Sequence, residues 1–193
     1  RQLIAGEIPL HETGWGGWVW WAPLGTIPVS DVTEYWGGGR FLGLYPTHDQ
    51  MCVFAGGQIS KISFEISGRK QHVLDHFAAL TPALPTVFDA LPNDDQDIFF
   101  WKLDDVRSPI WSKGRVVLLG DAATAFLPTA GVGASMALES AAVLADELLR
   151  VEAKTLPRAL ALYEARHRKR VERAQSDSRH LAQAMLINST PIA

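Results

Sequence analysis

The sequence has little of several features that would each indicate a particular class of protein. It holds a single cysteine, Cys52, which excludes an intramolecular disulfide and indicates a reducing, cytoplasmic compartment, with the thiol as a small apolar residue of a strand. The net charge is only −3 at pH 7, so nucleic acid is not expected as a partner. No apolar run is long enough to span a bilayer and the first residues lack a signal-peptide layout, so we expect no stable membrane insertion.

The most informative segment is residues 114–133. Val116–Leu119 are four consecutive apolar residues, two of them β-branched, and they predict a fully buried strand. This strand stops at Gly120-Asp121, which places a carboxylate at its carboxyl end. Open α/β sheets bind their ligands at that edge. The segment therefore predicts a ligand-binding strand end.

A loop and a helix follow this carboxylate. The loop carries Pro128, Gly131 and Gly133, and residues 134–150 predict a helix because they are rich in alanine and contain no breaker. The two glycines let a ligand approach the backbone where the first-turn amides of the helix are free and the helix dipole is positive. About a dozen residues separate the strand from the helix, unlike the tight turn of an ordinary dinucleotide fingerprint. We expect a corner that binds anions and polyols.

This segment resembles the second flavin-binding motif of the FAD-dependent aromatic hydroxylases, the p-hydroxybenzoate-hydroxylase-like flavoprotein monooxygenases. The family pattern runs Gly-Arg-Val-x-Leu-x-Gly-Asp-Ala-Ala-His, then Pro, then Gly-x-Gly and a helix. The resemblance implies that Asp121 accepts hydrogen bonds from the ribityl chain of FAD. Two positions depart from the pattern, Thr124 in place of histidine and Ser135 in place of asparagine. The cofactor-binding residues that the resemblance implies are Gly120, Asp121, Ala122, Pro128, Gly131, Val132, Gly133 and Ala134.

The family's other signatures are not found in the sequence. These are an amino-terminal strand-Gly-x-Gly-x-x-Gly-helix unit, which holds the ADP part of FAD, and an Asp-Gly motif; the segment Arg1–Gly6 resembles the part that follows them. We therefore expect this chain to be the carboxyl-terminal part of a longer protein, with on the order of 150 further residues. Alone, it should be poorly stable and bind little FAD.

The resemblance also implies an activity. Flavin reduced by NADPH or NADH would react with dioxygen to give a C4a-hydroperoxide, which hydroxylates an aromatic or polycyclic small molecule. No catalytic acid or base and no metal ligand is assigned, and the oligomeric state stays open. The alternatives are a halogenase or a reductase of the same fold, or a catalytically silent module whose sheet binds an apolar ligand.

The first half of the chain predicts β structure. Residues 14–64 read as an antiparallel sheet with one covered face, in which strands 40–45 and 51–55 form a hairpin. Residues 69–80 predict a helix and residues 97–103 a strand. In the resembled family this sheet belongs to the substrate domain and covers the flavin ring.

Aromatic and histidine residues offer further candidates. Trp18 and Trp20 share one face of a strand and Trp21 lies on the other, because side chains alternate with a period of two. Trp18 and Trp20 either line a pocket for a planar substrate or fill the core of the sheet, and the core is favoured. His72 and His76, spaced i, i+4, are interpreted as a surface pair.

The carboxyl-terminal part predicts one long helix with Pro157 in its first turn and a narrow, mixed-polarity stripe from Leu160 to Met185. The basic run 166–170 is interpreted as a solvated or interdomain face rather than a phosphate or membrane patch.

The fold class is α/β, mixed α+β, with an antiparallel substrate-domain sheet, one parallel strand-helix unit of the flavin domain and the long helix. The predicted division is 1–108 substrate-binding sheet, 109–150 part of the FAD-binding domain and 151–193 interdomain helix.

Overall fold

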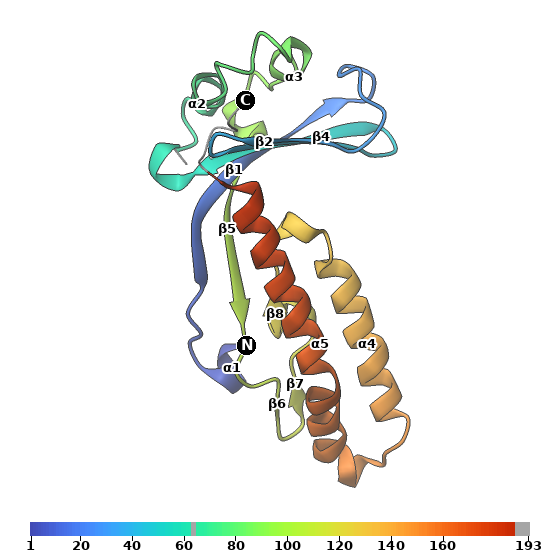
Figure 1. The fold of residues 1–193 in the computed structure, drawn as a ribbon. Coiled ribbons are helices and arrows are strands. Elements are labelled where there is room, and N and C mark those ends of the chain that lie inside the picture. The colour runs from blue at the N-terminus through green and yellow to red at the C-terminus, as the bar shows by residue number, and fades with distance from the viewer. Residues whose placement is uncertain (63–64, 188–193) are drawn as a thin grey trace. The chain divides into compact units, whose positions relative to one another are not determined.

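The computed structural model describes residues 1–62 and 65–187, which form two compact units (Figure 1). Unit 1 joins Arg1–Thr13 to Asp104–Ala184, and unit 2 joins Gly14–Leu103 to the chain from Met185. Strands β1 (His11–Pro23) and β5 (Phe99–Arg107) each supply residues to both units. The division into ranges 1–108, 109–150 and 151–193 concerns function, and it stays a prediction.

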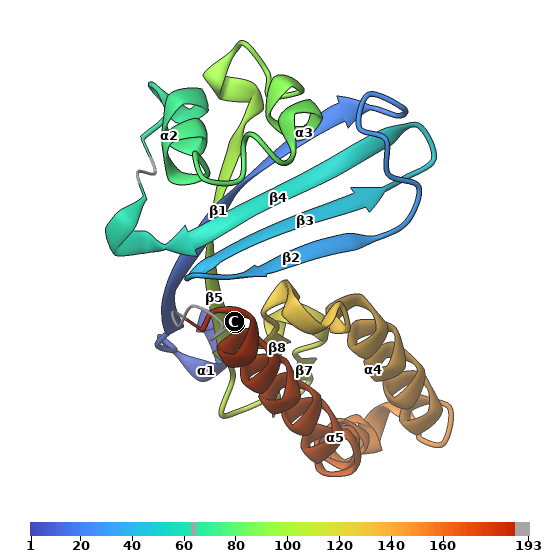
Figure 2. The same ribbon diagram turned by 45° about the horizontal axis from the view of Figure 1, so that its top comes forward.

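Unit 2 is built on an antiparallel sheet (Figure 2). Its strands run in the order β2-β3-β4-β1-β5, and the predicted hairpin of 40–45 with 51–55 is confirmed by the pairing of Leu44 with Val53. Gly38 and Gly39 take φ values of 57° and 70°, a left-handed turn between β2 and β3 that suits glycine. The remaining strands of this sheet are β2 (Thr33–Gly37), β3 (Arg40–Pro46) and β4 (Gln50–Gln58).

One face of this sheet is covered by α2 (Arg69–His76) and α3 (Pro85–Asp89). The helix predicted over 69–80 ends at His76, and Thr81 donates its hydroxyl proton to the carbonyl of Phe77 at 3.2 Å in the turns that follow. Large apolar side chains from both layers form the core of unit 2. They are Trp18, Trp20, Leu42, Leu44, Met51 and Val53 from the sheet, with Val73, Phe77, Val87 and Phe88 from the helical side.

Unit 1 packs α4 (Gly133–Leu148) beside α5 (Leu156–Met185), and the two helices confirm the predictions for 134–150 and for the carboxyl-terminal part. Pro157 lies in the first turn of α5, as expected. None of the helices within the described residues is long and apolar enough to cross a membrane.

The smaller elements of unit 1 are α1 (Gln2–Ala5), β6 (Ser112–Lys113), β7 (Val116–Val117), β8 (Thr124–Ala125) and the 3₁₀ turns η3 (Gly120–Ala122), η4 (Pro128–Ala130) and η5 (Ala153–Thr155). The 3₁₀ turns of unit 2 are η1 (Ile59–Lys61) and η2 (Asp95–Asp97).

The prediction of a fully buried parallel strand at 116–119 is wrong for the described residues. Strand β7 covers only Val116 and Val117, and it pairs antiparallel with β6. Leu118 is buried, but Val116 is 52% exposed and Leu119 36%. Val116 and Leu118 share one face of the chain by the two-residue period, but only Leu118 lies in the core of unit 1, so composition alone did not give their exposure.

Polar groups on the buried side of α5 attach this helix to β5 and β8. The fully buried Gln175 donates from Nε2 to the carbonyls of Val106 (3.0 Å) and Ala125 (2.6 Å) and accepts from Arg107 Nε at 2.7 Å. Most of the predicted stripe is buried, including its polar members His167 and Ser178, but Gln175 was not part of that prediction. Gln175 and Ser178 satisfy backbone groups that no apolar side chain could.

His76 is not the surface residue that we expected. Its ring packs against Trp18 with centroids 5.9 Å apart, and a Cβ at Gly57 would overlap it. Burial, and then the charges of Arg40 and Lys61, lower the pKa of His76 from 6.5 to about 4.

The lowered pKa predicts acid sensitivity. Between pH 6.5 and about 4 the unfolded chain binds more protons at this position than the folded chain, so stability should fall as pH falls through that window. Urea unfolding across this range should show a smaller pH dependence in His76→Phe than in the parent. His48→Gln, in an exposed turn, is the control. An equal pH dependence in His76→Phe and the parent would refute this assignment.

The second prediction concerns Gln175. Gln175→Leu removes the partners of two carbonyls and of the Arg107 Nε proton, and each buried polar group left unpaired costs about 1–3 kcal/mol. The urea midpoint should therefore drop clearly. Gln183→Leu, at an exposed position of the same helix, should stay within about 0.5 kcal/mol of the parent. Similar midpoints for both variants would show that the contacts contribute no net stability.

Candidate functional site

Asp121 lies in the turn η3, directly after the short strand region. Gly120 takes φ 55°, and a Cβ there would come within 3.3 Å of the Ala137 side chain, so this turn packs closely on α4. The backbone carbonyl of Asp121 accepts a hydrogen bond from Arg1 at 3.1 Å. Its side chain is exposed, and within the described part of the chain its carboxylate has no hydrogen-bond or ion-pair partner. The Asp121 carboxylate is therefore free to accept hydrogen bonds from a ligand, as the motif predicts.

The loop between η3 and α4 is held by hydrogen bonds to α5 and is open around Gly131. Ser178 of α5 donates to the Leu127 carbonyl at 2.9 Å, and Thr129 donates to the Ser178 carbonyl at 2.8 Å. Gly131 takes φ 62°, and nothing lies within 4 Å of a Cβ placed there. Val132 is the N-cap residue of α4 and has no side-chain acceptor, so the first-turn amides stay available to a ligand.

The predicted cofactor residues lie in these two places of unit 1. Gly120, Asp121 and Ala122 form η3, and Pro128 begins η4. Gly131 and Val132 lead into α4, whose first residues are Gly133 and Ala134. Because η3 packs on α4, the chain offers an acceptor for a polyol, free amides for an anion and an open backbone approach. These residues fit the requirements of FAD.

The two departures from the motif differ in accessibility. Thr124 is buried in β8, and its hydroxyl has no hydrogen-bond partner among the described residues. Ser135 is exposed in the first turn of α4. Only the second of these side chains is placed where a ligand at the helix start can meet it.

The outer side of α4 is apolar. Leu138 is 74% exposed and Leu148 38%, and exposed alanines at 134, 141 and 145 continue the same stripe along the helix. Most exposed helix faces are polar, since water solvates them. This side of α4 has the composition of a buried surface.

In unit 2, the sheet face opposite α2 and α3 carries a polar group that the sequence analysis missed. Tyr45 donates its phenol proton to Glu34 at 2.7 Å, and Trp36 Nε1 donates to the same carboxylate at 3.1 Å. Burial, and then the hydrogen bond to Glu34, raise the pKa of Tyr45. Gly43 lies opposite Glu34 in the sheet, beneath the Tyr45 ring. The β2–β3 register that unites these groups was not readable from the sequence.

The tryptophan faces are as predicted, and the core interpretation fits them best. Trp18 and Trp20 are fully buried under the helical layer, whereas Trp21 is 43% exposed on the open face of the sheet. Cys52 pairs with Trp21 across the strands and is half-buried, and burial raises the pKa of its thiol. A substrate role for Trp18 and Trp20 stays a prediction, and the helices would have to move to expose them.

The chain is similar in sequence to a known family and to named monooxygenases. The profile of the FAD binding domain family matches residues 30–178. The 6-hydroxynicotinate 3-monooxygenase of Pseudomonas fluorescens is 29% identical over 158 residues, which are 78% of this chain and 40% of that protein. The aurachin C monooxygenase/isomerase of Stigmatella aurantiaca is 34% identical over 182 residues, 90% of this chain and 44% of that protein.

Solved structures share the fold. HpxO of Klebsiella pneumoniae, complexed with FAD and uric acid, superposes with a TM-score of 0.84 at 22% identity over 96% of this chain and 48% of that one. A salicylate hydroxylase substrate complex has a TM-score of 0.77 at 21% identity, covering 96% of this chain and 51% of that one. The chain thus spans about half the length of these relatives. By the family profile and these relatives, the chain belongs to the FAD binding domain family, among the FAD-dependent aromatic hydroxylases.

Proposed function

We propose that this chain is the carboxyl-terminal part of a FAD-dependent, NAD(P)H-using monooxygenase that hydroxylates an aromatic or polycyclic small molecule with dioxygen. The observation that carries the proposal is the unpaired, exposed Asp121 carboxylate beside the open, uncapped start of α4. A cytoplasmic location is part of the same proposal.

Bound flavin supplies the redox chemistry, and the protein supplies binding and position. Asp121 accepts hydrogen bonds from the polyol chain of the cofactor. The free amides at the start of α4 favour negative charge next to them, since the helix dipole is positive at that end. Gly131 leaves room for a ring to approach the backbone.

The substrate-facing surface that the fold supports best is the open face of the sheet in unit 2. Trp21 offers an exposed aromatic plane there, and the half-buried Phe54 packs on the buried Phe41 with ring centroids 5.5 Å apart. The Glu34 carboxylate, held by Tyr45, can accept a hydrogen bond from a polar group of the substrate. A planar molecule with a polar edge matches this surface.

The exposed apolar side of α4 supports the view that further polypeptide completes the flavin site. Leu138 and Leu148 would be covered by such a segment, and so would the exposed edge of β7. The chain also spans only about half of its relatives. We infer that residues 109–150 are part of a FAD-binding domain and that residues 1–108 carry the substrate sheet.

Replacing Asp121 tests the cofactor assignment in the intact protein that contains this chain. Asp121→Ala loses charge-assisted hydrogen bonds worth roughly 1.5–3 kcal/mol, so FAD should dissociate roughly 10- to 100-fold more readily. The ratio of flavin to protein absorbance after dialysis and the dissociation constant measure this. Glu152→Ala removes an exposed carboxylate elsewhere in unit 1 and is the control. Unchanged flavin occupancy in Asp121→Ala would count against the assignment.

A tryptophan pair tests the substrate surface. Trp21→Ala should weaken the binding of aromatic probes such as salicylate, 6-hydroxynicotinate and uric acid, with little change in unfolding temperature. Trp18→Ala should instead lower stability by about 3–5 kcal/mol, because it empties the core beneath α2 and α3. Probe titrations and thermal unfolding separate the two effects. If Trp21→Ala bound every probe as the parent does, the open face would not be the substrate surface.

A further inference from the structure

Unit 1 contains a hollow of about 610 Å³ between the loop that leads into α4 and one side of α5. Its volume lies within the range of about 300–1,000 Å³ typical of small-molecule sites. Val132 and Met136 supply an apolar wall on the α4 side. The charged residues that line it all come from α5, and they are Lys169, Arg170, Arg173 and Asp177.

Two of the three cations of this hollow differ from their neighbours on the same helix. Arg166, Arg168 and Arg179 each form an ion pair with a carboxylate. Lys169 and Arg173 form no ion pair or hydrogen bond with any residue that the structure describes. The basic run at 166–170 is therefore only partly neutralised, and its unpaired charge points to the hollow.

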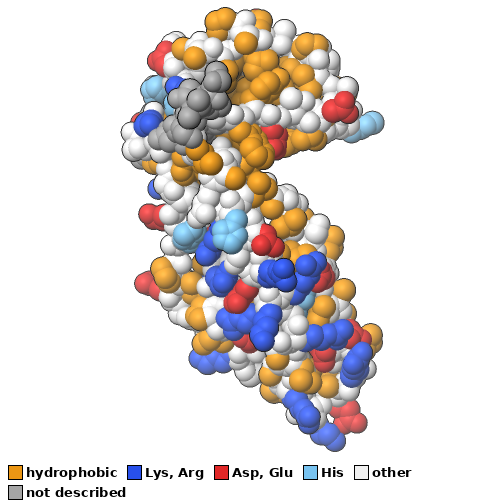
Figure 3. Space-filling view, viewed as in Figure 1, with side chains coloured by type: hydrophobic (Ala, Val, Ile, Leu, Met, Phe, Trp, Pro, Cys, Tyr) orange, Lys and Arg blue, Asp and Glu red, His pale blue; other side chains and the backbone are white. Residues whose placement is uncertain are grey.

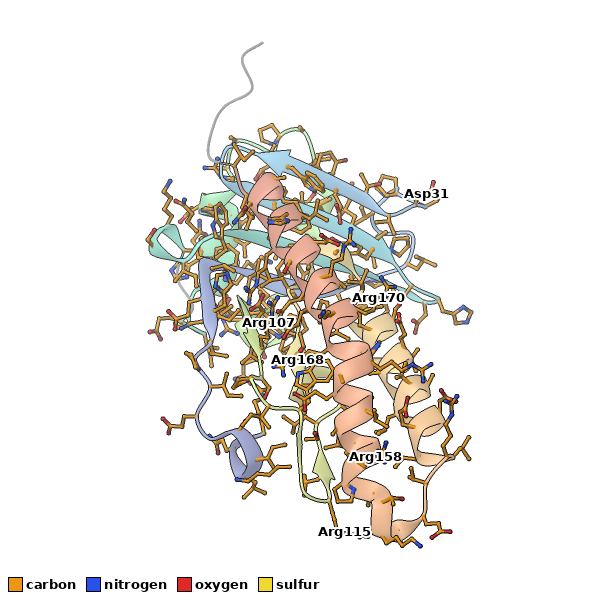
Figure 4. All side chains as sticks on the ribbon, turned by 60° about the horizontal axis from the view of Figure 1, so that its bottom comes forward. Asp31, Arg107, Arg115, Arg158, Arg168 and Arg170 are labelled. Atoms are coloured by element: carbon orange, nitrogen blue, oxygen red, sulfur yellow. The ribbon has the colours of Figure 1, made fainter. Side chains whose placement is uncertain are left out.

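The third cation, Arg170, is shared with the α4 helix. It meets Glu139 at 3.2 Å, on the side of α5 next to α4, while Arg107 and Arg168 lie on the opposite side of α5 (Figure 4). Lys and Arg side chains gather over this region of α5 in the space-filling view (Figure 3). With Asp177 as the one acid of the lining, the hollow keeps a net positive charge.

This arrangement carries a small cost in the free protein. Lys169 and Arg173 are spaced i, i+4, and like charges at that spacing destabilise a helix slightly. An anion held between them removes the repulsion and gains charge-assisted hydrogen bonds. The carboxylate of Asp177 adds an acceptor of the kind that binds a ribose hydroxyl, and the apolar wall suits a ring.

We propose that this hollow binds the phosphate groups of a nucleotide through Lys169, Arg170 and Arg173. That the anion is a nucleotide rests on the function proposed above, which offers two sources of phosphate: the pyrophosphate of FAD and the phosphates of NADPH or NADH. The basic run, interpreted from the sequence as a solvated or interdomain face, thus becomes a phosphate patch in part. Its paired members, Arg166 and Arg168, stay structural.

The double variant Lys169→Gln/Arg173→Gln tests this in the intact protein. Arg158→Gln is the matched control, because Arg158 is an exposed arginine of the same helix that has no ion pair in the described structure and does not line the hollow. Calorimetric titrations with FAD, NADPH, NADH and inorganic pyrophosphate are run at low and at high ionic strength. Thermal unfolding of all variants confirms that they are folded.

The double variant should bind one class of nucleotide, and pyrophosphate, roughly tenfold or more weakly than the control, with a shallower salt dependence. Loss confined to FAD identifies the flavin pyrophosphate as the occupant, and loss confined to NADPH or NADH identifies the nicotinamide cosubstrate. A third outcome is that the parent protein binds neither FAD nor a nicotinamide nucleotide, and that the double variant loses only pyrophosphate binding. The hollow would then be an anion site that binds no nucleotide, and the proposed function would be wrong. Equal affinities of the double variant and Arg158→Gln for all four probes would overturn the proposal.

Discussion

The anchoring of α5 by buried polar contacts is the constraint on which the rest of unit 1 depends. Where a long helix packs on the backbone of other segments, its side chains must supply donors to the buried carbonyl groups that face it. Gln175 does so for β5 and β8, and Ser178 does so for the segment before the glycine loop. Asp105 and Arg179 add a bidentate ion pair at 2.6 and 2.7 Å. The loop that we propose to meet the cofactor is thus held by a helix that itself lies outside the motif.

The flavin motif and the long helices could be predicted from the sequence. The helix after Gly133 and the helix containing Pro157 were predictable because their composition and periodicity extend over several turns. The hairpin around residues 47–49 was predictable from its flanking alternation. The faces of Trp18 and Trp21 followed from the two-residue period alone.

The remaining features depend on contacts between distant segments, which local patterns do not encode. The strand at 116–119 has a buried composition, but its exposure depends on the segments that pack against it, and among the described residues its strand partner is β6. Glu34 and Tyr45 meet only through the pairing of β2 with β3. The basic run of α5 is uniform in sequence, and its division into paired and unpaired cations depends on where α4 places its carboxylates. His167 of the same run is buried against Ser140 at 3.0 Å, and burial lowers its pKa.

The apolar outer side of α4 has a practical consequence for handling this polypeptide. With Leu138 at 74% exposure, water meets a hydrocarbon surface that two molecules can hide by stacking their helices together. We therefore expect a preparation of this chain alone to self-associate more strongly as its concentration rises. Glutamate or lysine at position 138 would suppress that clustering, at the expense of the surface that a completing segment needs.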